Sequence, residues 1–148
     1  MTAKRIEAVL RPASVAVVGA SDTPGSIGEV LCRNLREGGF RGPVFYVNPL
    51  HATIGDELSY PDVRSLPQTV DVAIVATPPP TLPTVLEHCG ERGVRGAIIV
   101  SAGFREGGEA GAAWERSMLQ VARRYGLRLL GPNSFGVIRT DNGFNASC

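Results

Sequence analysis

The chain has 148 residues and a mass of 15.6 kDa, which is the length of one ordinary domain. Hydrophobic residues make up 43% and charged residues 20% of it, a balance that indicates a soluble globular protein and excludes a disordered one. The net charge is only +1, so the basic excess typical of nucleic-acid-binding proteins is absent. Met1–Glu7 lacks the apolar stretch of a signal peptide, and no apolar run approaches the length of a membrane span. We therefore expect a cytoplasmic protein with neither a membrane nor a nucleic acid as partner.

Strand and helix signals alternate along the chain. Five short apolar runs predict β-strands: Ser14–Val18, Val44–Val47, Val72–Ala76, Ala97–Val100 and Leu127–Leu130. Most of these runs are continuous, which is typical of strands covered on both faces in a parallel sheet. Apolar residues at helical spacing predict helices over Ser26–Glu37, Leu82–Gly93 and Ala112–Tyr125. This order predicts an α/β fold: a Rossmann-like, doubly wound, mainly parallel sheet with helices on both faces.

Two further stretches carry weaker patterns. Gly55–Val70 is rich in turn residues, and we expect one short helix around Asp62–Leu66. Val137–Cys148 has the pattern of a segment that begins further structure. We therefore interpret residues 1–148 as one binding domain at the amino-terminal end of a longer protein.

The residue types that usually carry catalysis are sparse and scattered. The acids in the expected loops, Asp22 and Glu106, form no evident pair, and the only histidines are His51 and His88, the second expected on a helix surface. No serine lies in the elbow motif of hydrolases, and the three cysteines show no metal-binding spacing. We expect Cys32 and Cys89 to be small apolar helix residues. The sequence predicts neither a catalytic group nor a metal site.

The loop after the first strand has the composition of a phosphate-binding loop. In doubly wound folds ligands bind at the carboxyl ends of the strands. Gly19 permits a sharp turn, Gly25 lets the backbone approach a ligand, and Gly28 lets the following helix pack closely on the sheet. Backbone N–H groups at the start of that helix then point at an anion. A glycine-rich turn without a ligand is the alternative.

The second loop argues against a nicotinamide dinucleotide. The first-loop glycines follow a G-x5-G-x2-G spacing, which is longer than the dehydrogenase fingerprint. The second strand ends in Asn48-Pro49-Leu50-His51, without the carboxylate that accepts from the ribose of NAD. A neutral or cationic group there tolerates a phosphorylated ribose better, and His51 is either that cation or an exposed loop residue.

The three later loops are stiff or rich in small polar residues. Thr77–Pro80 forms either an apolar wall beside a ligand or the first turn of the next helix, because proline is tolerated there. In Ser101–Glu106, Arg105 is placed to bond Glu106 or to reach a phosphate. Gly131–Gly136 again couples glycines with small polar residues. Together the loops suit a phosphorylated nucleotide with an apolar arm.

Five motifs in order carry a family resemblance over nearly the whole chain. They are Val17–Ser21 with Gly25 and Gly28, Val47–Pro49, Ala76–Pro79, Ser101–Phe104 and Leu130–Asn133. In this order they resemble the CoA-binding domain of NDP-forming acyl-CoA synthetases, the group that contains succinyl-CoA ligase alpha chains and ADP-forming acetyl-CoA synthetases. The same domain opens some protein acetyltransferases, so a regulatory CoA-binding module is the alternative. An NAD(P)-binding oxidoreductase domain is the less favoured alternative.

The resemblance implies a role for each loop. Ser21–Ile27 would bind the CoA phosphates, Leu50 or His51 would face the 3′-phosphate, and Pro78–Pro80 would line the adenine and pantetheine side. The pantetheine end would meet Val100–Ala102, with Gly131–Ser134 toward the thiol. The candidate coenzyme A-binding residues are Gly19, Ser21, Asp22, Gly25, Ser26, Ile27, Gly28, Asn48, Pro49, His51, Thr77, Pro78, Pro79, Val100, Ser101, Ala102, Gly103, Asn133 and Ser134.

Two positions depart from the family pattern, and essential parts are absent. Relatives often have lysine after the Asn-Pro pair, where this chain has Leu50-His51, and cysteine after Gly-Pro-Asn, where it has Ser134. The family's phosphorylated histidine lies in a second domain, and its ATP-grasp part lies elsewhere again. The resemblance therefore implies a fragment that binds CoA or acyl-CoA but needs the remaining synthetase domains, or a beta subunit, for turnover.

Overall fold

The structure is a computed structural model that describes residues 2–148, with side chains described from Ile6 onward. Met1 and the side chains of residues 2–5 lie outside that description, and with them most of the Met1–Glu7 segment in which we expect no signal peptide. Within residues 2–148, no helix combines the length and apolarity that crossing a membrane requires.

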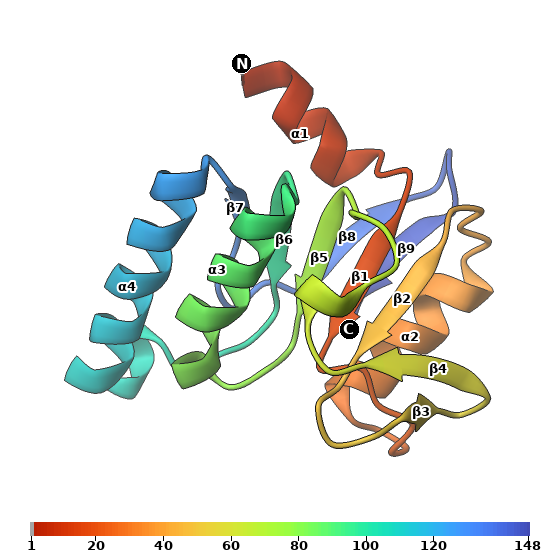
Figure 1. Cartoon of the computed structure of the whole chain (residues 1–148), viewed down its shortest axis with the longest axis horizontal. Helices are drawn as coiled ribbons and strands as arrows, with labels where there is room; N and C mark the ends of the chain where they lie inside the picture. Colours follow the sequence, from red (N-terminus) through yellow and green to blue (C-terminus); the bar gives the residue numbers. More distant parts are fainter. Residues whose placement is uncertain (1) are drawn as a thin grey trace.

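The main sheet has seven strands in the order β3-β4-β2-β1-β5-β6-β7 (Figure 1). All neighbouring strands run parallel except β3, which is antiparallel to β4. The strands are β1 (Val15–Val18), β2 (Val44–Val47), β3 (Thr53–Ile54), β4 (Glu57–Tyr60), β5 (Val72–Val75), β6 (Gly96–Ile99) and β7 (Arg128–Leu130). We call the edge at which the parallel strands end the carboxyl edge, and the edge at which they begin the amino edge.

Helices cover both faces of the sheet, which confirms the doubly wound prediction. One face carries η1 (Val63–Ser65), η2 (Pro79–Thr81), α3 (Leu82–Arg92), η3 (Arg105–Gly107) and α4 (Glu109–Tyr125); the other carries α1 (Thr2–Leu10) and α2 (Ile27–Glu37). Successive residues of β1 alternate between the two cores: Ala16 and Val18 pack toward α3 and α4, and Val15 and Val17 toward α2. Because both cores are apolar, the strand sequence is continuously hydrophobic.

Three structured parts have no counterpart in the predicted elements: α1, the β3–β4 hairpin, and a separate hairpin of β8 (Gly136–Arg139) and β9 (Phe144–Ser147). The stretch 55–70 is therefore not only turns, because β4 pairs with β2 there; the short helix expected around Asp62–Leu66 is present as η1. The β8–β9 hairpin packs its β9 strand on α2, where Phe144 is fully buried against Phe40.

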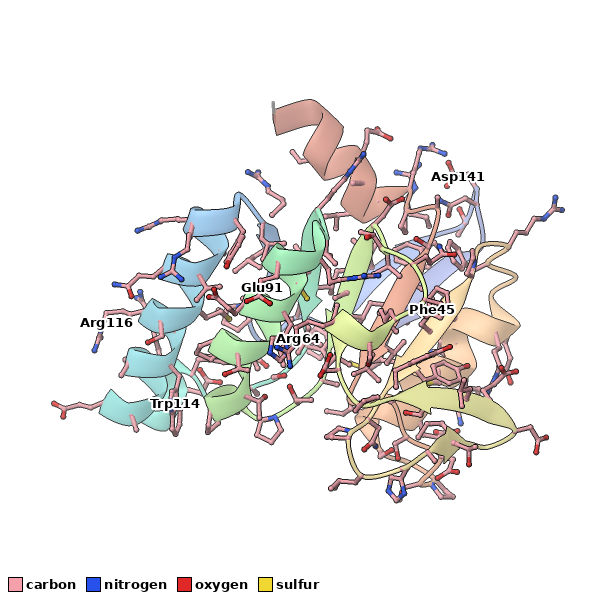
Figure 2. All side chains as sticks on the ribbon, viewed as in Figure 1. Phe45, Arg64, Glu91, Trp114, Arg116 and Asp141 are labelled. Atoms are coloured by element: carbon pink, nitrogen blue, oxygen red, sulfur yellow. The ribbon has the colours of Figure 1, made fainter. Side chains whose placement is uncertain are left out.

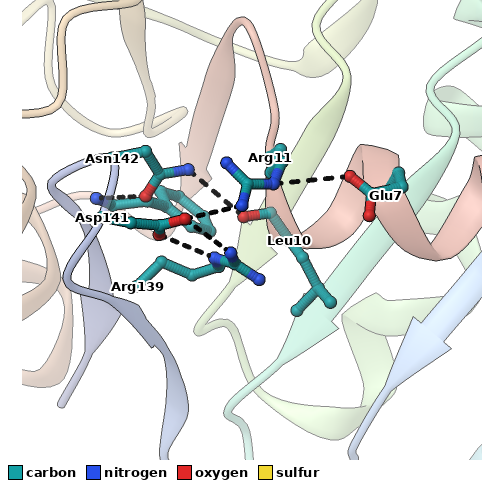
Figure 3. Close-up of polar contacts among 7 residues, drawn as sticks. Glu7, Leu10, Arg11, Arg139, Asp141 and Asn142 are labelled. Atoms are coloured by element: carbon teal, nitrogen blue, oxygen red, sulfur yellow. Dashed lines mark hydrogen bonds and ion pairs between the residues drawn. The ribbon is translucent and has the colours of Figure 1, made fainter.

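An ion-pair network joins α1 to the β8–β9 turn at the amino edge (Figure 3). The carboxylate of Asp141 accepts hydrogen bonds from Arg11, at 2.6 Å, and from Arg139, at 2.8 Å. Arg11 also pairs with Glu7 at 3.6 Å, and Asn142 donates to the carbonyl of Leu10. The pKa of Asp141 lies below its usual range, chiefly because of the hydrogen bond from Arg139, which together with Arg11 outweighs the opposing effect of burial.

Candidate functional site

The first loop at the carboxyl edge, residues 19–26, adopts the open conformation that its glycines permit. Gly19 and Gly25 have positive φ values of 92° and 80°, which L side chains rarely adopt. A Cβ atom on Gly25 would meet nothing within 4 Å, so the loop is open at that point. A Cβ on Gly28 would lie 2.0 Å from the carbonyl oxygen of Gly19, which confirms that Gly28 allows α2 to pack against the end of β1.

Two serine hydroxyls of this loop shape the loop itself. The hydroxyl of Ser21 accepts from the N–H of Thr23, and that of Ser26 caps α2 by accepting from the N–H of Glu29. Within residues 2–148, no acceptor bonds the N–H groups of Ile27 and Gly28, in the first turn of α2. These two donors, at the positive end of the helix dipole, are the groups that an anion such as a phosphate would satisfy.

Hydrogen bonds hold the second loop and the β3–β4 turn against the first loop. The side-chain amide of Asn48 donates to the carbonyl of Ala20 at 2.9 Å, and its oxygen accepts from the N–H of Leu50 at 2.8 Å. The carboxylate of Asp22 accepts from the N–H of Gly55 at 3.0 Å. Both side chains, which the sequence offered as ligand contacts, therefore bond the protein itself.

A pocket of ≈ 420 Å³ opens beside these loops, on the α3 face of the carboxyl edge. It collects residues that follow β1, β2, β4 and β5, together with one side of α3. The lining residues are Val18, Gly19, Val47, Pro49, Pro61, Asp62, Val63, Thr77, Pro80, Thr81, Thr84, Val85 and His88. Its wall is mostly apolar with a few hydroxyls, which suits a flat ring or an alkyl chain better than a charged group.

The one carboxylate in the pocket wall, Asp62, is already engaged. Its oxygens accept from the N–H of Ser65, as the cap of η1, and from Arg64 at 3.3 Å. Burial alone would raise the pKa of Asp62, but the hydrogen bond and charge of Arg64 outweigh it and hold that pKa below 3.8. Figure 2 shows Arg64 between η1 and α3, so Asp62 is an ionised structural group and not a proton donor.

The fourth and fifth loops are tied to the third in a row along the same edge. The buried hydroxyl of Ser101 donates to the carbonyl of Thr77 at 2.5 Å. The N–H of Asn133 donates to the carbonyl of Ser101 at 2.9 Å, and the N–H of Ser134 donates to that of Ile99 at 3.1 Å. The loops after β5, β6 and β7 therefore form one connected surface.

The pairing of Arg105 with Glu106, one of the two alternatives for the fourth loop, is wrong. Arg105 pairs with Glu115 of α4, whereas the carboxylate of Glu106 accepts from the N–H of Gly103 at 2.5 Å. This hydrogen bond lowers the pKa of Glu106. Both side chains therefore fasten the loop, Glu106 to Gly103 and Arg105 to α4, because each finds a nearer partner than the other.

The structure brings together some of the predicted residues and separates others. Gly19, Pro49 and Thr77 line one pocket, whereas His51 is exposed and lies outside its wall. Of Pro78–Pro80 only Pro80 lines it. Pro79–Thr81 forms the 3₁₀ turn that leads into α3, which confirms the helix-start interpretation, while the wall beside a ligand stays a prediction. His88, expected on the helix surface, is half-buried in the pocket wall.

Sequence reasoning missed the pocket wall made by Pro61, Val63, Thr84 and His88. A signal was present at the start of α3 and along it: Thr81, which precedes the helix, and Thr84 and His88 within it follow helical spacing next to the apolar stripe. Nothing comparable marked Pro61 and Val63, because they reach the pocket only through the pairing of β4 with β2.

The described residues offer no alternative chemistry. They contain no group of three or more His, Cys, Asp or Glu side chains able to hold a metal ion. Burial raises the pKa of Cys32 to about 11 and that of Cys89 to about 12, so both thiols stay protonated and inert, as expected for apolar helix residues.

Residues 13–140 match the CoA binding domain family. The chain belongs to this family. As a CoA-binding domain it has coenzyme A as its cofactor.

The relatives of this CoA-binding domain are longer proteins. It is 45% identical to an ADP-forming acetate–CoA ligase II of Archaeoglobus fulgidus over 92% of its own length and 20% of that protein. It is 42% identical to the alpha subunit of the ADP-forming acetate–CoA ligase I of Pyrococcus furiosus, over 96% of its length and 32% of the subunit. The chain thus spans between a fifth and a third of the length of these relatives.

A solved structure agrees with the fold and the family. The acetyl-coenzyme A synthetase 1 of Candidatus Korarchaeum cryptofilum, in complex with phosphate and ADP, superposes with a TM-score of 0.89 at 37% identity. The match covers 96% of the CoA-binding domain and 30% of that chain. In the present chain, the first loop fits coenzyme A on physical grounds. Gly25 leaves open space, and the N–H groups of Ile27 and Gly28 have no acceptor among the described residues and could bond a phosphate.

Proposed function

We propose that the chain is the CoA-holding part of an ADP-forming acyl-CoA ligase. The observation that carries this is a juxtaposition at the carboxyl edge: unpaired N–H groups of Ile27 and Gly28 in the described chain, next to a mostly apolar pocket of ≈ 420 Å³. The donors suit the pyrophosphate of coenzyme A, and the pocket suits its adenine ring. No other edge of the described chain combines the two.

The remaining loops then take the pantetheine arm. Ser101 and Asn133 lie in the connected row that starts at Thr77, so an extended chain leaving the pocket would follow that row. Val100, Ala102, Gly103 and Ser134 belong to the same row. The contacts proposed for His51, Pro78 and Pro79 stay predictions.

The chain supplies binding and orientation, and turnover needs other parts. Among the residues that line the pocket, the titratable side chains are those of Asp62, which Arg64 holds ionised, and of His88. We propose that the phosphohistidine and the ATP-grasp part belong to further synthetase domains or a beta subunit in the cytoplasm. With ATP, acetate and coenzyme A, the 148-residue chain alone should therefore release no ADP.

Calorimetric titration with coenzyme A tests the binding, with NADH as the competing ligand. Thr84→Trp places an indole in the pocket wall and should weaken coenzyme A binding at least about tenfold, since a filled pocket excludes the ring. The control Gln120→Trp, on an exposed part of α4, should leave the affinity unchanged. A folded native chain that binds NADH and ignores coenzyme A would refute the proposal.

A further inference from the structure

Asp22 poses an electrostatic problem in a loop that binds phosphates. It is exposed and lies between Ser21 and Thr23, in the loop that leads to the free donors of α2. A carboxylate there repels a phosphate group, and the repulsion grows as water is displaced. A glycine-rich loop needs no acid to turn, so some other interaction has to account for the charge.

The structure shows what the carboxylate does. It accepts a hydrogen bond from the N–H of Gly55, which lies 33 residues further along the chain, in the turn between β3 and β4. Gly55 has a φ of 59°, and a Cβ on it would meet nothing within 4 Å, so it is the backbone N–H of this residue that reaches the loop. A hydrogen bond to an ionised acceptor is the stronger kind.

Near its turn the β3–β4 hairpin is also held by Ile54, which is buried in the core beside α2, but by few hydrogen bonds. β3 has two residues, and β4 is paired with β2 through only Ser59 and Tyr60, at the end remote from the turn. Asn48 ties the first loop at Ala20, next to β1, and Asp22 ties it two residues further on. The two side chains together form a brace between the first loop and the strands beside it.

We propose that Asp22 is a positioning residue whose carboxylate fastens the β3–β4 turn to the phosphate loop and does not itself contact coenzyme A. The inference rests on the proposed function and deepens it. By restricting residues 21–25, the brace presents the N–H groups of Ile27 and Gly28 to the phosphates in advance of binding. The gain from this preorganisation exceeds the repulsion that the charge adds.

Two substitutions at one position separate the brace from the charge. Asp22→Asn keeps an oxygen that accepts from Gly55 but removes the charge, so it should bind coenzyme A at least as tightly as the native chain. Asp22→Ala loses both and should bind about tenfold more weakly, because the loop must then be ordered on binding. If both variants bind more tightly, the charge alone matters; if both bind more weakly by the same factor, Asp22 is a ligand contact. Either result overturns the proposal.

Asp56 provides the matched control in the same turn. It is an exposed carboxylate with no bonding partner among the described residues, so Asp56→Asn and Asp56→Ala should bind coenzyme A equally well. Amide hydrogen exchange at Gly55, measured without ligand, should be slow in the native chain and in Asp22→Asn and fast in Asp22→Ala. Unaltered exchange in Asp22→Ala would overturn the brace even if affinity fell.

The two proposals fail in different ways. The proposed function is overturned if Gly55 exchanges slowly in the native chain and fast in Asp22→Ala, but the native chain binds no coenzyme A. A native chain that binds coenzyme A, with Asp22→Ala binding it equally well, overturns the positioning role alone. Circular dichroism of each variant checks that the fold is intact.

Discussion

The two edges of the sheet use polar groups in opposite ways. At the amino edge, Asp141 is bonded by Arg11 and Arg139, and the charges of the network neutralise one another (Figure 3). At the carboxyl edge, side chains such as Asp22 bond the backbone, while backbone donors of α2 are left without a partner in the described chain. The first arrangement fastens α1 to the β8–β9 turn, and the second leaves N–H groups that could bond a ligand.

Pocket volume does not explain why coenzyme A would bind at the carboxyl edge of the sheet rather than at the amino edge. The amino edge has the larger hollow, ≈ 680 Å³, between Arg11, Phe40 and the β8–β9 turn. Its wall lies beside the carboxyl ends of α1 and α2, where helix dipoles repel anions, and Arg11 is already paired. The smaller pocket has unsatisfied donors beside it. Unpaired backbone donors in the described chain, more than volume, distinguish the edge at which we propose that coenzyme A binds.

The largest expected effect comes from a matched pair of glycine substitutions, one at each edge. A Cβ on Gly28 would lie 2.0 Å from the oxygen of Gly19, and a Cβ on Gly42 would lie 2.0 Å from that of Ala13. Each alanine variant should lose about 1–3 kcal/mol of unfolding free energy, since backbone has to shift to admit the methyl group. Urea denaturation measures this loss.

The coenzyme A affinities of the two glycine variants should then differ, because only one of the glycines lies at the carboxyl edge. Gly28→Ala displaces the first turn of α2 from the loop and should weaken the affinity of the folded protein more than tenfold. Gly42→Ala should leave it unchanged, because residue 42 precedes β2 at the amino edge. Equal loss of affinity in both variants would show that global destabilisation, and not loop geometry, controls binding.

A smaller effect is expected where two loops of the carboxyl edge are joined. Ser101→Ala removes the hydroxyl that donates to the carbonyl of Thr77 and leaves that oxygen short of a partner. The loss should be about 1 kcal/mol of unfolding free energy, the usual contribution of such a bond. If Ser101 also orders the pantetheine side, coenzyme A should lose more affinity than adenosine 3′,5′-bisphosphate, which lacks that arm. Titration of both ligands measures the difference, and equal losses would confine Ser101 to stability.

The fold was predictable wherever burial was two-sided. Val15–Val18 and Val72–Val75 are buried at every position, so their sequences are apolar throughout and could be recognised as central strands. β4 shows the opposite case: Leu58 is 60% exposed while Ser59 is buried, so no hydrophobic pattern marks the strand. Its existence depends on long-range pairing with β2, which a local pattern does not encode.

In the candidate site, too, local features could be predicted from the sequence and long-range contacts could not. The sharp turn at Gly19 and the close packing at Gly28 depend on local backbone conformation and were predicted correctly, whereas the approach of a ligand at Gly25 stays a prediction. The partners of Asp22 and Arg105 lie 33 and 10 residues away, and nothing local names them. Chain spacing therefore predicted how the loops of the carboxyl edge turn and pack, whereas the partners of their charged side chains required the tertiary structure.

The smallest effect is expected at the amino edge, and pH reveals it. The pKa of Asp141 is lower in the folded chain than its ordinary value of 3.8, so the carboxylate stabilises the fold above that value. The contribution is lost as the pH falls through the lower, folded pKa. Asp141→Asn removes it at every pH, so the variant should melt slightly below the native chain at pH 7. The gap should narrow as the pH falls below about 3.8, because the unfolded chain then takes up a proton that the folded carboxylate still resists. Coenzyme A affinity at pH 7 should be the same in both proteins, because the network lies at the edge away from the loops. Melting curves of both proteins at pH 7 and at acidic pH measure the stability difference, and a coenzyme A titration at pH 7 measures the affinity. Weaker binding in Asp141→Asn would show that the two edges are coupled.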